Sequence, residues 1–183
     1  MRLDLVPHPS TPTSAPPFKV WATVELSASF ALMATANIWF AVEAPVSRFV
    51  MPDAEEPKRA DGLWKTTCCE AFLRETGTKA YREWNFAPSG RWAVYDFQTY
   101  REGMSKPDVE APPYVRVEDN LTWWTLGATV AVESGKTWEM NLTAVLEEKD
   151  GTKSYWAIAH PPGRPDFHDA ACFALPLAAR AVA

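Results

Sequence analysis

Short runs of β-branched and aromatic residues, separated by turn signals, recur along the whole chain and constrain its fold more than any other feature. Several of these runs alternate apolar and polar residues, as strands buried on one face do. No helical period is sustained, apart from a short turn expected at 169–173. The pattern predicts an all-β protein, an antiparallel sandwich or barrel. The expected strands are 19–26, 38–43, 47–51, 66–73, 81–87, 92–97, 114–117, 121–132, 137–147, 154–159 and 172–177.

Prolines and glycines indicate how these strands are connected. Residues 1–17 hold five of the 16 prolines, which predicts an extended N-terminal extension with an edge strand at its start. Loops are expected at 105–113 and 161–165, and hairpin turns at Pro88-Ser89-Gly90 and Asp150-Gly151. Composition does not change across these breaks, and 183 residues suit one domain. We therefore expect a single domain over 18–183.

The charge and cysteine content exclude several classes of protein. The net charge is −5 and Lys and Arg are not clustered, so no nucleic-acid partner is expected. No apolar run approaches the roughly 20 residues of a membrane span, so no membrane partner is expected. The first residues lack the apolar stretch of a secretory signal, which favours a cytoplasmic location. Three cysteines favour free thiols over a disulfide framework, and nothing in the sequence indicates an oligomeric state.

Sequence signatures of catalysis and of metal binding are missing. The chain has no nucleophile elbow, phosphate-binding loop, dinucleotide fingerprint or His-Glu-x-x-His. His160 and His168 flank a Pro-rich loop with Asp166 and Asp169 nearby, but their spacing matches no usual ligand pattern. No metal is therefore expected, with His160 and His168 as the residues to check. The alternative is that Asp166 and His168 hydrogen-bond the loop onto the end of a sheet.

Polar residues with several donors and acceptors are interleaved with aromatics between Asp61 and Met104. Period two places Glu83 and Asn85 on one strand face and Trp84 on the opposite, core face. Carboxylates and amides can hydrogen-bond adjacent hydroxyls, and a Trp ring can cover the C–H face of a sugar. These residues therefore form either a site for a polyhydroxylated ligand or the closed end of a sandwich. The residues considered for that site are Glu70, Glu83, Asn85 and Arg101.

Short motifs in this block and near the end of the chain carry a family resemblance. They are Leu63-Trp64, Cys-x-Glu-x-Phe at 68–72, Tyr-x-Glu-Trp-Asn-Phe at 81–86, Pro-Ser-Gly-x-Trp-x-x-Tyr at 88–95, Tyr-Arg-x-Gly-Met at 100–104 and Pro-Asp-Phe-His at 165–168. The chain resembles the DOMON-like domains, in the branch grouped with family 9 carbohydrate-binding modules, from about residue 18 to the end. The motifs are typical of a bacterial group of stand-alone proteins. The resemblance implies an immunoglobulin-like antiparallel β-sandwich of two sheets.

The resemblance implies ligand contacts but no single function, because relatives bind either sugars or haem. Sugar-binding relatives use a Trp, a Glu on the next strand and polar residues on the strand after it, which match Trp64, Glu70, Glu83 and Asn85. Glu83 stands where those relatives tend to use Arg. They add a second aromatic from a later loop, for which Trp124 is expected, with Trp123 as the alternative. In haem-binding relatives Met and His are axial ligands, and Met104 with His168 or His160 would be candidates here.

Three functional hypotheses follow. The leading one is a non-catalytic module that binds a carbohydrate or a similar polar small molecule without a cofactor. The alternative is a b-type haem domain of cytochrome type. The third is a glycoside hydrolase using Glu70 and Glu83, which would need the two carboxyls ~5–9.5 Å apart.

Overall fold

The computed structural model describes residues 1–12, 17–27 and 33–178, and within them the regular secondary structure is almost entirely β-strand. Three short 3₁₀ helices connect the strands: η1 (Val46–Arg48), η2 (Leu63–Lys65) and η3 (Ala170–Cys172). None of the helices in these residues is long and apolar enough to cross a membrane. The strands are β1 (Arg2–Pro7), β2 (Val20–Ser27), β3 (Met33–Val42), β4 (Cys68–Glu75), β5 (Tyr81–Phe86), β6 (Trp92–Phe97), β7 (Tyr114–Asp119), β8 (Trp124–Glu133), β9 (Thr137–Glu147), β10 (Lys153–Ala157) and β11 (Leu175–Ala178).

The strands form one continuous antiparallel path in the order β6-β5-β4-β9-β10-β1-β2-β3-β8-β7, with β11 paired to β9 beside it. Strand β1 pairs with β2 through Leu5 and Val20 and with β10 through Val6 and Ala157. The edge strand expected at the start of the chain is therefore an interior strand that joins the two halves of the path. Residues 13–16 of the predicted extension lie outside the described residues.

The all-β prediction is confirmed, and every predicted run except one overlaps a strand. The exception is 47–51, where η1 follows Pro45. Proline fixes the backbone angle at which this turn begins. The apolar content of that run reflects packing, since the Phe49 side chain is fully buried. The turn expected at 169–173 is η3, where the Asp169 side chain accepts a hydrogen bond from the Ala171 backbone N–H.

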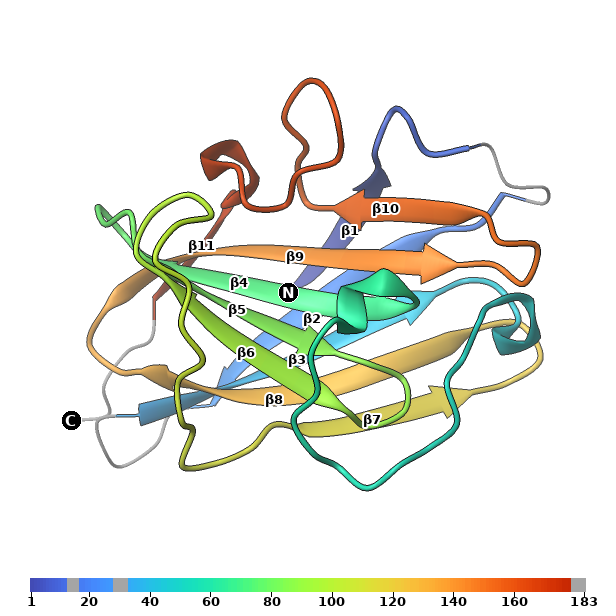
Figure 1. The fold of residues 1–183 in the computed structure, drawn as a ribbon, viewed down its shortest axis with the longest axis horizontal. Helices are drawn as coiled ribbons and strands as arrows, with labels where there is room; N and C mark the ends of the chain where they lie inside the picture. The colour runs from blue at the N-terminus through green and yellow to red at the C-terminus, as the bar shows by residue number, and fades with distance from the viewer. Residues whose placement is uncertain (13–16, 28–32, 179–183) are drawn as a thin grey trace.

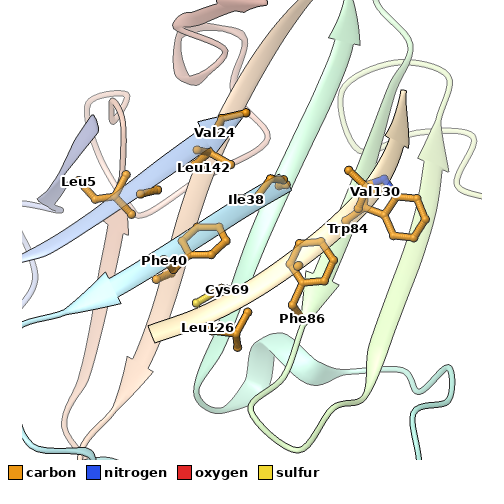
Figure 2. Packing of buried hydrophobic residues seen from close by; sticks show 14 of the residues in the cluster. Leu5, Val24, Ile38, Phe40, Cys69, Trp84, Phe86, Leu126, Val130 and Leu142 are labelled. Atoms are coloured by element: carbon orange, nitrogen blue, oxygen red, sulfur yellow. The ribbon is translucent and has the colours of Figure 1, made fainter. Parts of the chain in front are cut away.

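The main hydrophobic core draws side chains from both halves of the strand path. Figure 2 shows Ile38 and Phe40 of β3 gathered with Cys69 of β4 and Leu142 of β9. Trp84 of β5 lies in this cluster, as its strand parity predicted. Burial of this kind, at roughly 25 cal/mol per Å² of apolar surface, is the main source of stability in a sheet protein. Cys68, Cys69 and Cys172 are buried free thiols, which confirms the expectation from the cysteine count.

A second, smaller cluster lies on the opposite face of β4 and β5. Phe72 of β4 and Tyr81 of β5 contact Phe173, with ring centroids 6.3 and 5.6 Å from it. Phe167 and Val145 belong to the same cluster. The segment between β10 and β11 therefore packs on this outer face, and it bounds the candidate site described below.

Candidate functional site

A cleft of about 610 Å³ opens on this outer face. It contains four of the residues that the sequence singled out: Trp64, Glu70, Glu83 and Arg101. Clefts of this size with an aromatic lining and a few polar groups are typical of small-molecule sites. The other lining residues are Lys65, Tyr95, Phe97, Met104, Val145, Lys153, Tyr155, Pro165, Phe167 and His168.

Glu70 lies on β4, opposite Asn85 of β5 and Thr143 of β9. Its side chain is 3% exposed. The Thr143 hydroxyl donates a hydrogen bond of 2.8 Å to Glu70 Oε2, which fixes one carboxyl oxygen. Burial, followed by the nearby charge of Glu83, raises the pKa of Glu70 to about 8. Glu70 can therefore exist in either protonation state near neutral pH.

Glu83 and Asn85 follow one another on the same face of β5, as period two predicted. The Asn85 amide donates a 2.6 Å hydrogen bond to Glu83 Oε1, and the Cys68 thiol donates to Asn85 Oδ1 at 3.7 Å. Burial raises the pKa of Glu83. Asn85 is fully buried and does not line the cleft, so it orients Glu83 rather than contacting a ligand itself.

Arg101 reaches the cleft from the loop after β6 and is fixed by contacts with a second loop. Its guanidinium donates to Asp166 Oδ1 at 2.8 Å, and the Tyr100 hydroxyl donates to Asp166 Oδ2 at 2.5 Å. Its φ of 56° is the only left-handed value for a non-glycine residue among those described. Such backbone angles are uncommon outside glycine and occur where the surrounding contacts hold them, often at functional sites.

His168 is connected to the same network through a tyrosine. The Arg101 backbone N–H donates to the Tyr81 hydroxyl at 3.1 Å, and that hydroxyl lies 2.8 Å from His168 Nδ1. A tyrosine that accepts from Arg101 has its own proton to donate to Nδ1, so we assign the His168 proton to Nε2. Nε2 lies 3.7 Å from Glu83 Oε2. Burial lowers the pKa of His168 to about 4, so its imidazole is neutral at pH 7. His168 thus binds its loop to the sheet through Tyr81, as the sequence alternative proposed, whereas Asp166 binds that loop to the loop after β6.

Trp64 is presented at the cleft by η2, whose N-terminal Gly62 has a left-handed φ of 74°. Its indole is 44% exposed, and it meets the Tyr95 ring edge-on at a centroid distance of 6.0 Å. The Tyr95 hydroxyl donates to Asp61 Oδ1 at 2.8 Å, which fixes that ring. A large exposed ring on a fixed support is suited to stacking on a ligand.

The expectation that Trp124 contacts the ligand is wrong. Trp124 begins β8 and is fully buried in the main core, with its ring 5.7 Å from that of Phe49. Two consecutive tryptophans on a strand must point to opposite faces, and the structure buries the second of them. Trp123 is 38% exposed but lies in a different groove, with Trp21 and Trp39.

The histidines do not support a metal site. His160 packs edge-on against His8 at 4.9 Å and lies 2.9 Å from the Val6 carbonyl oxygen through Nε2, whereas His168 lies among the cleft aromatics. Among the residues that the structure describes, no group of three or more His, Cys, Asp or Glu side chains could hold a metal ion.

A haem does not fit the residues that would have to hold it. Met104 and His168 both line the cleft, but His168 Nδ1 contacts Tyr81, and Nε2, the atom that would bind iron, is directed at Glu83. Glu70 and Glu83 also place two acidic groups where a porphyrin needs an apolar surface. Axial ligation of a haem iron would require His168 to turn away from its contacts with Tyr81 and Glu83.

Sequence reasoning missed most of the aromatic lining. Tyr95 could have been found, because it is paired with Glu83 across β5 and β6 and points to the same face. Tyr155 carries no local signal and Phe167 only its place in the motif at 165–168, since their position in the cleft depends on how β10 and the following loop fold back. For Asp166 the sequence suggested only a hydrogen bond that holds its loop, and its contacts with Tyr100 and Arg101 were not expected.

The sequence matches no family model and no curated protein. The fold is similar to that of a proposed carbohydrate-binding protein from Bacteroides uniformis ATCC 8492, with a TM-score of 0.63, 17% identity, and 95% of this chain and 83% of that one covered. It is also similar to a family 9 carbohydrate-binding module from Caldicellulosiruptor kristjanssonii in complex with cellotriose, with a TM-score of 0.55, 9% identity and coverage of 89% and 74%. At these identities the likeness is one of fold.

Proposed function

We propose that this protein is a non-catalytic module that binds a carbohydrate through the cleft between Trp64 and the Glu70–Glu83 face. One observation carries the proposal: a single cleft contains an exposed indole and two carboxyls. Each carboxyl has one oxygen already fixed by a hydrogen bond. The fold shared with a family 9 carbohydrate-binding module in complex with cellotriose supports it. We further infer a DOMON-like domain whose two strand groups face each other as an immunoglobulin-like sandwich.

The chemistry of the cleft matches that of a sugar ring. The Trp64 face can cover the apolar C–H side of a pyranose, and carboxyl oxygens can accept hydrogen bonds from adjacent hydroxyls. Because Thr143 and Asn85 hold Glu70 and Glu83 in place, little side-chain freedom is lost when a ligand binds. Arg101, which also lines the cleft, can donate to a ring or hydroxyl oxygen of the sugar.

Calorimetric titration with mono- and disaccharides tests the proposal. Replacement Trp64→Ala should weaken binding about 10-fold or more, because stacking on an aromatic ring contributes on the order of 1 kcal/mol beyond its buried area. The matched control is Trp123→Ala, which removes a similarly exposed indole from the other groove and should leave affinity unchanged. Absence of heat for every sugar tested would contradict the proposal.

A hydrolase remains the second candidate, because two carboxyls of raised pKa share the cleft. A neutral acid beside a second carboxyl is the pattern used in glycoside hydrolysis. Chromogenic glycosides would be cleaved by the intact protein and not by Glu70→Gln if this candidate is right. Binding without turnover favours the module.

A further inference from the structure

We propose that the ligand of this cleft carries a protonated primary amine on its hydroxylated ring, so that the site selects an amino sugar over a neutral sugar. The inference rests on the proposed function and names the class of carbohydrate. It follows from the charges and aromatic rings that surround the cleft.

The floor of the cleft holds two acids, and the charge of Arg101 acts on both of them without forming an ion pair with either. Glu70 and Glu83 are 3% and 5% exposed, and they lie on neighbouring antiparallel strands. Each has one oxygen bonded to a neutral donor, Thr143 or Asn85, and neither forms an ion pair with Lys or Arg among the described residues. Glu70 Oε1 makes no hydrogen bond within the same part of the chain. Burying an ionised acid without an ion-pair partner is unfavourable, and a cationic ligand would offset that cost.

The cations that line the cleft are largely committed elsewhere. Arg101 is paired with Asp166 at 2.8 Å. The Lys153 ammonium donates to the Lys65 carbonyl at 2.5 Å and lies 3.6 Å from Glu147. Lys65 is exposed at the rim, where water and salt screen its charge. The buried floor is therefore acidic, while the rim is nearly balanced.

The aromatic walls favour the same ligand. Trp64, Tyr95, Phe97, Tyr155 and Phe167 all line the cleft. An ammonium near the face of such rings is attracted to them, and the attraction grows as water is excluded. An ammonium also donates three hydrogen bonds, which suits two carboxyls with free acceptor positions. A neutral hydroxyl in its place would supply no positive charge to either acid.

Calorimetric titration with four sugars of one ring size tests the inference: glucosamine, glucose, N-acetylglucosamine and glucuronate. Glucosamine should bind at least 10-fold more tightly than glucose or N-acetylglucosamine. Replacement Glu83→Gln, which keeps the shape and removes the charge, should reduce that ratio to near one. The matched control Glu118→Gln alters an acid of the other groove and should preserve the ratio. Thermal unfolding of each variant shows that it is folded, and Glu70→Gln replaces any Glu83 variant that is not.

Proton exchange gives an independent readout. Because burial raises the pKa of Glu70 to about 8, a bound ammonium should shift this group toward its ionised form and release a proton at pH 7. The binding enthalpy of glucosamine should then differ between two buffers of unlike ionisation heat, and Glu70→Gln should remove that difference.

The possible outcomes separate the inference from the function on which it rests. Equal affinity for glucose and glucosamine, or a preference for glucuronate, would overturn the inference that the ligand carries an amine, while supporting a sugar site. No binding of any of the four, or of larger sugars, overturns both.

Discussion

The two faces of β4 and β5 are both buried, yet they are built from different chemistry. The inner face presents Ala71, Trp84 and Phe86 to the main core, and each is matched by apolar neighbours. The outer face presents Glu70 and Glu83, which are as little exposed but form no ion pair with Lys or Arg among the described residues. Burial by itself therefore does not distinguish a core from a site. The distinction lies in whether the buried groups are satisfied by the protein alone.

The difference has an energetic meaning. Apolar side chains stabilise the fold as they are removed from water, whereas two neighbouring carboxyls destabilise it unless one of them holds a proton. The inner face should then tolerate little change, and the outer face should become more stable when its charge is removed. Three predictions test this comparison.

Trp84→Ala should have the largest effect, a loss of about 3–5 kcal/mol in the free energy of unfolding. The indole is 3% exposed and stacks on Phe86 at a centroid distance of 6.4 Å, so its removal leaves a cavity. Chemical denaturation measures the loss. Trp64→Ala is the control, and its free energy of unfolding should change by less than about 1 kcal/mol because the indole is largely exposed.

The contribution of Glu70 to the stability of the protein should fall as pH rises from about 5 to 8, whereas His168, whose pKa is lowered, acts in the opposite direction below about pH 6.5. The folded-state pKa of about 8 lies above the ordinary value of 4.5, so the folded state holds a proton that the unfolded state has lost. The Glu70 contribution is complete below the ordinary value and is lost as pH rises through the folded value. Glu70→Gln should flatten this dependence and stabilise the protein near pH 8 by on the order of 1–3 kcal/mol.

Unfolding midpoints in denaturant, measured at several pH values for both proteins, give this comparison. Asp96→Asn serves as a control, since Asp96 pairs with Arg82 on the rim of the sheet and outside the cleft. Parallel pH profiles for the native protein and Glu70→Gln would contradict the view that the outer face stores the repulsion.

Arg101 offers the smallest and most selective effect. Its left-handed backbone costs about 1 kcal/mol, which glycine avoids, whereas its pairing with Asp166 is lost in either replacement. Arg101→Ala should therefore be less stable than Arg101→Gly by about 1 kcal/mol. Both should bind the sugar ligand more weakly than the native protein. Equal stability of the two variants would show that the backbone angle is not strained.

Much of this comparison could be predicted from the sequence, because period two decides which residues of a strand share a face. It placed Trp84 inward and Glu83 with Asn85 outward, and both positions agree with the structure. Asn85, however, hydrogen-bonds Glu83 and does not reach the cleft. Strand alternation predicts the face to which a side chain points, but not whether it reaches the surface of that face. Trp124 shows a related difficulty, since alternation directs neighbouring residues such as Trp123 and Trp124 to opposite faces without indicating which of the two is buried.

The remaining site depends on contacts between distant segments. Asp166 meets Tyr100 and Arg101, and His168 meets Tyr81, through pairs separated by more than sixty residues. No local pattern encodes how the loop after β10 returns to the loop after β6. The role of β1 was missed for the same reason, since prolines in the following residues suggested a peripheral segment.

The interior position of β1 has a consequence for the order of folding during synthesis. The ribosome makes β1 long before β10, one of the two strands with which it pairs. Until Val6 can meet Ala157, the nascent chain carries unpaired backbone groups along one side of β1. Pairings of such high contact order form slowly and leave strand edges open to other chains. The step that joins the two halves of the sheet is therefore where this protein most needs protection from aggregation.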